Sequence, residues 1–116
     1  MIILIQARSN SKRFPEKIFQ VIDGIPLIDY SIKSAIQTGL YLCVVIPKDD
    51  LKLIRYLEDR NINYFQGDEF DVLDRFYQCA KLSGQNTIIR LCADTLYSKD
   101  DILEMIELYD KRGKFT

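Results

Sequence analysis

The chain begins with a short apolar run, and this run restricts the fold more than any other feature. Met1 to Ile5 reads Met-Ile-Ile-Leu-Ile, with no polar residue at alternate positions. A strand with one face in water would show that alternation, so the run predicts a strand buried on both faces of a parallel sheet.

Strand and helix signals alternate along the rest of the 116 residues. Further strands are expected at 40–46, 61–65 and 87–91. Helices are expected at 26–38 and 50–60, then one that is opened by residues 66–76 and one from about 98. The third helix should turn an apolar stripe to the core, made of Leu73, Phe76, Tyr77 and Ala80. This alternation predicts one Rossmann-like, doubly wound α/β domain over 1–116, mostly parallel, with strand order 3-2-1-4.

A polar loop over residues 6–17 follows the first strand. It holds two serines, an asparagine and four cations, Arg8, Lys12, Arg13 and Lys17. Ligands of α/β sheets bind at the carboxyl ends of strands, and cations with hydroxyls suit a polyphosphate. Basic loops are often only solvated connectors, but this one is long for its place and Pro15 restricts its exit.

A single acid, Asp94, follows the fourth strand. With strand order 3-2-1-4 the first and fourth strands are neighbours, and the polar loop would face Asp94 at the point where the topology reverses. Opposed cations and one carboxylate suit a nucleoside triphosphate with Mg²⁺. The plainer alternative is that a lone aspartate after a strand serves only the turn.

Composition removes several classes of function. The formal net charge of −1 gives no bulk attraction to nucleic acid or membranes, and no apolar run approaches the ~18 residues that cross a bilayer. The chain has no histidine, which excludes imidazole bases and histidine zinc sites. The three cysteines, Cys43, Cys79 and Cys92, lack C-x-x-C spacing and predict reduced core thiols in a cytoplasmic protein.

Three segments resemble the cytidylyltransferase family, which activates acidic sugars such as KDO and sialic acid as CMP-sugars. Gln6-Ala7-Arg8, Ser11, Arg13, Pro15 and Lys17 resemble the signature Q-A-R-x-x-S-x-R-[LF]-P-x-K. Gly67 with the run Asp71 to Phe76 resembles G-x-x-x-D-V-L-x-R-[FY]. Arg90, Leu91 and Asp94 match R-[IL]-x-[GA]-D-x-P.

The resemblance implies a fold of the nucleotide-diphospho-sugar transferase type. It implies transfer of CMP from CTP to a sugar, in that family an acidic one, with release of pyrophosphate during polysaccharide biosynthesis. The roles it implies are Mg²⁺ binding by Asp94, neutralisation of phosphate charge by Arg8 and Lys17, phosphate orientation by Ser11 and Arg13, and base contacts by Ala7, Gly67 and Arg75.

Members of that family are about twice as long, so the chain is expected to be a truncated, N-terminal half that turns over poorly or not at all. The resemblance also leaves open whether the chain forms a homodimer. Two departures, Glu16 for the usual Gly and Leu96 for the usual Pro, keep a second reading open: a non-catalytic nucleotide-binding or interaction module. A dinucleotide-binding oxidoreductase is disfavoured because no G-x-G-x-x-G follows the first strand.

Overall fold

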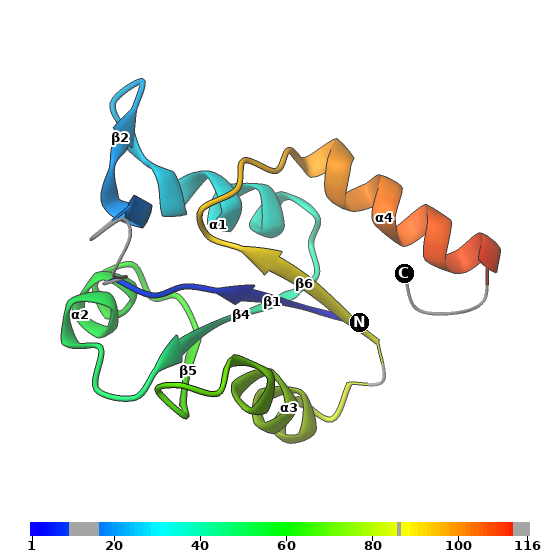
Figure 1. Ribbon diagram of the computed structural model, residues 1–116. Helices are drawn as coiled ribbons and strands as arrows, with labels where there is room; N and C mark the ends of the chain where they lie inside the picture. Colours follow the sequence, from blue (N-terminus) through cyan, green and yellow to red (C-terminus); the bar gives the residue numbers. More distant parts are fainter. Residues whose placement is uncertain (10–16, 86, 113–116) are drawn as a thin grey trace.

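A four-stranded parallel sheet forms the centre of the molecule (Figure 1). The computed structural model describes residues 1–9, 17–85 and 87–112. The sheet strands are β1 (Ile2–Gln6), β4 (Tyr41–Pro47), β5 (Tyr64–Gly67) and β6 (Ile88–Cys92). Their order is β5-β4-β1-β6 and every pairing is parallel, which confirms the predicted order 3-2-1-4.

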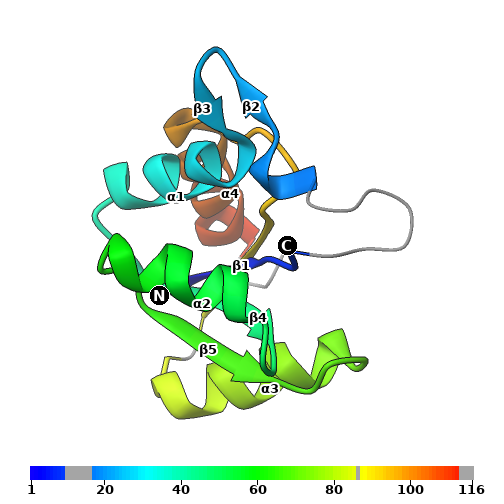
Figure 2. The ribbon, with the colours of Figure 1, turned by 90° about the vertical axis from the view of Figure 1, so that its left-hand side faces the viewer.

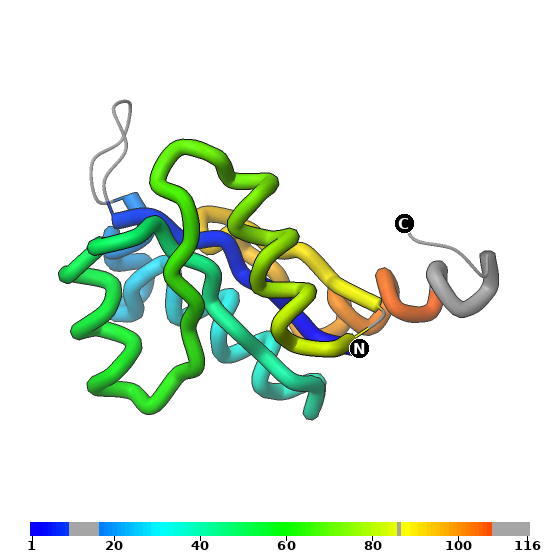
Figure 3. The backbone as a smooth tube through the Cα atoms, turned by 90° about the horizontal axis from the view of Figure 1, so that it is seen from below, coloured from blue at the N-terminus to red at the C-terminus, as the bar shows by residue number. Residues whose placement is uncertain are grey.

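Helices cover both faces of the sheet (Figure 2). They are α1 (Leu27–Gln37), α2 (Leu51–Asp59), α3 (Val72–Ser83) and α4 (Lys99–Arg112). One face packs against α1, α2 and α4 in a core that includes Ile3, Ile5, Ile28, Leu53 and Ile102. The other face packs against α3, which lies across β4 and β1 when seen from below (Figure 3). The arrangement is therefore doubly wound, and Ile2 to Ile5 are buried as their apolar run predicted.

A short segment joins β1 to α1 and carries one end of the polar loop. Its described residues after the gap at 10–16 include the 3₁₀ helix η1 (Lys17–Phe19) and a hairpin of β2 (Val21–Ile22) and β3 (Ile25–Pro26). Asp23 and Gly24 both have positive φ, 52° and 79°, as a tight two-residue hairpin turn requires.

The predicted third strand, 61–65, was placed too early. Asn61 has φ 56° and the amide of Ile62 donates to the carbonyl of Leu57, so these residues close the end of α2. Pairing with β4 begins only at Tyr64.

The predicted core stripe of α3 was confirmed for Phe76 and Ala80, which pack in the core, and was wrong for Leu73 and Tyr77. Leu73 and Tyr77 are exposed, at 70% and 59%, whereas Arg75, Phe76 and Cys79 are buried. Arg75 fits on the inner face of the helix because Gly67 has no side chain in the space that Arg75 occupies. A helical stripe read from hydrophobicity alone excludes a buried arginine.

Two further predictions can be compared with the structure. Cys92 is exposed, because it stands at the end of the edge strand β6, so it is not the core thiol that was predicted. Within the described residues, no helix combines the length and the apolar character that a bilayer crossing needs.

Candidate functional site

The carboxyl ends of β1 and β6 place two chain segments side by side. Gln6 is in register with Cys92, and the amide of Ala93 donates to the carbonyl of Gln6 at 2.8 Å. On the other side the amide of Ala7 donates to the carbonyl of Val45 at 3.0 Å. The polar loop and the segment after β6 therefore leave the sheet at the same level, where its topology reverses.

Lys17 and Asp94 meet at this edge. The Nζ atom of Lys17 lies 3.8 Å from Oδ2 of Asp94, with side chains 41% and 46% exposed. The two residues that follow Lys17 hold its backbone in position. Ile18 is buried in the core, and the Phe19 ring packs edge-on against Tyr56 of α2, with 5.1 Å between the ring centroids. The predicted meeting of the polar loop with Asp94 is thus present in the structure.

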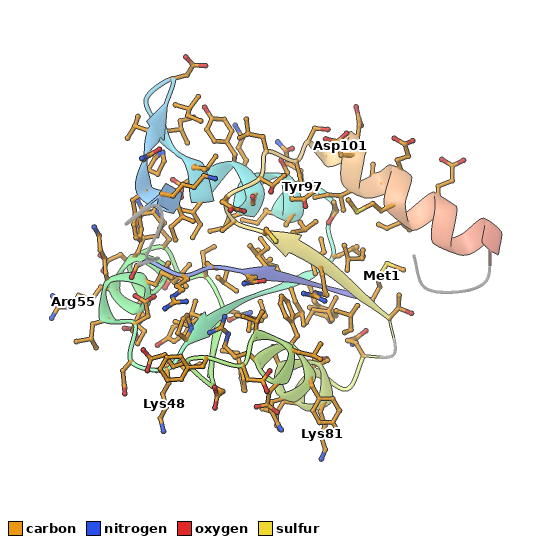
Figure 4. All side chains as sticks on the ribbon, viewed as in Figure 1. Met1, Lys48, Arg55, Lys81, Tyr97 and Asp101 are labelled. Atoms are coloured by element: carbon orange, nitrogen blue, oxygen red, sulfur yellow. The ribbon has the colours of Figure 1, made fainter. Side chains whose placement is uncertain are left out.

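Two serines of α1 hold the segment that carries Asp94. Ser31 Oγ donates to the carbonyl of Thr95 at 3.0 Å, and Ser34 Oγ donates to that of Tyr97 at 2.6 Å. Figure 4 shows Tyr97 beside α1. Both serines are buried, so their hydroxyls occupy helix positions that would otherwise be apolar. They fix the backbone on which the Asp94 carboxylate is presented.

Replacing Ser31 by alanine should lower the free energy of unfolding by about 1 kcal/mol, because the carbonyl of Thr95 loses its donor. Urea unfolding followed by circular dichroism measures this change. The control is Lys33→Ala, an exposed position on the same helix, for which a change within about 0.5 kcal/mol is expected. Equal effects of the two substitutions would contradict a role for the Ser31 hydroxyl.

Arg8 lies on the β4 side of the same edge. It lines a hollow of about 350 Å³ together with Ser9, Lys48, Lys52 and Glu69, among others. The start of the polar loop is fixed here, since Ser9 donates to both carboxylate oxygens of Asp50, from its amide at 2.9 Å and its hydroxyl at 2.6 Å. Asp50 also accepts from the amide of Leu53 as the N-cap of α2.

Arg75 lies beneath the end of β5. Its side chain is 1% exposed, and Nη1 donates to the carbonyls of Asp68 and Glu69 at 3.0 and 3.2 Å. A Cβ on Gly67 would stand 2.5 Å from Cγ of Arg75, so the glycine is needed for this packing. Nε of Arg75 has no hydrogen-bond partner among the described residues.

The charge of Arg75 is in an unfavourable environment. Burial, and next the positive charge of Arg8, lower the pKa of Arg75, although Asp68 and Asp71 oppose this change. An arginine still remains protonated at neutral pH. Two cations that repel one another at the carboxyl edge would be stabilised by an anionic ligand.

The acids that precede α3 have defined partners in the structure. Asp68 accepts from the amides of Asp71 and Phe70, which lower the pKa of its carboxyl group. Asp71 is the N-cap of α3 and accepts from the amide of Asp74. These bonds direct the carbonyls of residues 68 and 69 toward Arg75.

The residues predicted for the site are distributed in three places. Lys17 and Asp94 are in contact, Arg8 lies across the edge from them with Ala7 buried beside it, and Gly67 and Arg75 pack against each other below β5. Ser11 and Arg13 lie outside the described residues. The supporting side chains that the sequence did not reveal are Ser9, Asp50, Ser31 and Ser34.

Sequence signals for these four residues were weak. Asp50 stands at the start of the helix expected at 50–60, but nothing in the sequence indicates its two hydrogen bonds with Ser9.

The donors around Asp94 fit a hard divalent cation only if a ligand shares the metal. Within the described residues no group of three or more acidic, cysteine or histidine side chains could hold a metal. Mg²⁺, however, is commonly bound by one or two carboxylates together with substrate phosphates. Asp94, half exposed beside Lys17, suits that arrangement.

The fold and this edge define a doubly wound α/β domain with opposed cations and a carboxylate at its switch point, a class in which ligands bind at that point. The cytidylyltransferase family model matches residues 2–115. The chain therefore belongs to the cytidylyltransferase family.

Three known proteins illustrate the similarity. The spore coat polysaccharide biosynthesis protein SpsF of Bacillus subtilis is 28% identical over 122 residues, covering 97% of this chain and 51% of SpsF. A pseudaminic acid cytidylyltransferase of Campylobacter jejuni is 45% identical over 53 residues, covering 44% of this chain and 22% of that protein. The solved structure of CMP-2-keto-3-deoxy-manno-octonic acid synthetase with CTP has a TM-score of 0.82 at 18% identity, covering 97% and 48% of the two chains.

Nearly all of this chain aligns with SpsF and with the synthetase, but it spans only about half of the length of each.

Proposed function

We propose that this chain provides the nucleotide-binding part of a cytidylyltransferase, which transfers CMP from CTP to a sugar and releases pyrophosphate. The observation that carries the proposal is the contact of Lys17 with Asp94 across the ends of two adjacent strands. One relative is named a pseudaminic acid cytidylyltransferase and another a spore coat polysaccharide biosynthesis protein, which supports a sugar substrate. An acidic sugar is accordingly the proposed acceptor.

Each charged side chain has a proposed role at this edge. Lys17 leaves Asp94 to bind phosphate oxygens of CTP, and Arg8 binds the same chain of phosphates from the β4 side. The positive environment of Arg8 and Arg75 favours this anion. The family resemblance adds Ser11 and Arg13 as residues that orient the phosphates. Rate enhancement would come from positioning and from neutralising charge as pyrophosphate departs.

Asp94 is the proposed Mg²⁺ ligand, sharing the ion with the phosphates. When bound, Mg²⁺ would polarise the α-phosphate toward attack by the sugar hydroxyl. Thr95 Oγ1 lies 3.4 Å from Oδ1 of Asp94, and the serines of α1 keep the backbone of this segment in place. We place the reaction in the cytoplasm, where thiols such as those of this chain stay reduced.

Isothermal titration with CTP tests the proposal. The chain should bind CTP with Mg²⁺ saturably, and Lys17→Ala should weaken binding roughly 10- to 100-fold, the equivalent of about 1.5–3 kcal/mol for one interaction with a charged group. Lys81→Ala is the control: it removes the same charge from an exposed position on α3, where Lys81 points away from the sheet (Figure 4). Its affinity should be unchanged.

Two results would contradict the proposal. One is a folded chain that binds no nucleotide, which would favour an interaction module. The other is equal weakening by both lysine substitutions, which would indicate general attraction between the protein and a polyanion rather than a site.

A further inference from the structure

Two cysteines that are distant in the sequence are in contact in the structure. Sγ of Cys43 on β4 lies 3.7 Å from Sγ of Cys79 on α3. Alternation along β4 turns Cys43 and Val45 to the α3 face, whereas Val44 and Ile46 face the other core. Cys79 lies one helical turn beyond Arg75, on the buried side of α3. The side of α3 that buries Arg75 therefore also places Cys79 against Cys43.

The pair can be reached by a small molecule. Both cysteines line a hollow of about 420 Å³ between β4, β5 and α3. Cys79 is buried, at 5% exposed, but Cys43 is only partly buried. A small reagent would thus meet Cys43 first, with Cys79 directly behind it.

We propose that Cys43 and Cys79 form a redox modification site, which a low-molecular-weight disulfide oxidises reversibly to an intramolecular disulfide. Cys43 as thiolate attacks one sulfur of the reagent, which releases one thiol and leaves a mixed disulfide on Cys43. Cys79 as thiolate then attacks Sγ of Cys43, which releases the second thiol. The protein loses two electrons and two protons, and the reagent gains them as two thiols.

Little movement is needed for this step. A disulfide bond is about 2.05 Å long, so the sulfurs must approach by less than ~2 Å. The exchange is independent of nucleotide binding. Disulfides of reducing compartments are commonly transient and redox-sensing, which agrees with a reversible bond between these two cysteines.

Ionisation of the pair favours the second step of the exchange, in which Cys79 attacks as thiolate. The hydrogen bond between the sulfurs lowers the pKa of Cys79 and, together with burial, raises the pKa of Cys43. One thiolate of the pair is thereby stabilised by the remaining thiol, and formation of a second is opposed. Thiol–disulfide exchange needs only one thiolate at each step.

Cys92 serves as an internal control. It is exposed at the end of β6, and the contact between Cys43 and Cys79 does not involve it. Burial of part of its side chain, and next the negative charge of Asp94, raise its pKa. It should form at most a mixed disulfide with the reagent.

The bond would join the sheet to the one helix that packs on this face among the described residues. It would close a loop over the 36 positions that separate the two cysteines. Constraining the unfolded chain in this way should raise the thermal midpoint on the order of 5–15 °C.

The test is to incubate the folded chain with oxidised glutathione and map its cysteines by peptide mass spectrometry. A cross-linked Cys43–Cys79 peptide and a raised thermal midpoint are expected, both reversed by dithiothreitol. Cys92→Ser should give the same result as the original chain. Cys43→Ser should give neither, and Cys43→Ala provides a second variant, with circular dichroism verifying that each is folded.

Two outcomes would overturn the proposal. One is that the folded chain accumulates only mixed disulfides, with no cross-linked peptide. The other is that the Cys43–Cys79 peptide appears only after denaturation, which would mean that the folded geometry does not permit the bond.

Discussion

Replacing Asp94 by asparagine should abolish the Mg²⁺ dependence of CTP binding. With Mg²⁺ present, affinity should fall roughly 10- to 100-fold, because the neutral amide no longer supplies a charged ligand to the metal. Without Mg²⁺, affinity should be unchanged or higher, because a negative charge that repels the phosphates has been removed. Isothermal titration with and without Mg²⁺ measures both values.

This pattern distinguishes Asp94 from Lys17. Lys17→Ala should weaken binding under both conditions, since a cation that contacts phosphate acts with or without the metal. Folding should be little affected by either change, because the ion pair between them is half exposed and such pairs contribute about 0–1 kcal/mol. Asp59→Asn, at the exposed end of α2, is the matched control and should keep full Mg²⁺ dependence. Retention of that dependence by Asp94→Asn would show that the metal is held elsewhere.

Gly67→Ala should lower the free energy of unfolding by about 1–3 kcal/mol, because even one added methyl group overlaps Arg75. The new Cβ would stand 2.5 Å from Cγ, 2.9 Å from Cβ and 3.0 Å from Cα of Arg75. The last of these atoms is backbone, so rotation of the Arg75 side chain cannot relieve all of the overlap. Urea unfolding followed by circular dichroism measures the loss.

A double-variant cycle identifies the partner. Arg75→Ala alone should cost roughly 2–4 kcal/mol, from lost packing and two hydrogen bonds of a charged group. In the double variant Gly67→Ala with Arg75→Ala, the overlap with Cγ is gone, so the total loss should be smaller than the sum of the single losses. Additive losses would show that Gly67 is required for some other reason.

The amino-acid sequence determined the sheet and the side of the sheet on which the site lies. An apolar run without alternation, followed by alternating helix and strand signals, restricts the chain to a few parallel arrangements, and short connections select among them. The order β5-β4-β1-β6 follows from those rules, and the meeting of Lys17 with Asp94 follows from that order. Both depend on regularities that repeat along the chain, so they can be read without knowing any single contact.

Only the tertiary structure decided the contacts between side chains of different elements. The bonds of Ser31 and Ser34 to the segment after β6, of Ser9 to Asp50, and of Cys43 with Cys79 join positions 36 or more residues apart. A local pattern records how polar or apolar a position is, but not which partner a folded neighbour will offer. Arg75 shows the difference: arginine side chains are seldom buried, yet the space left by Gly67 and two carbonyl oxygens accommodate this one inside the protein.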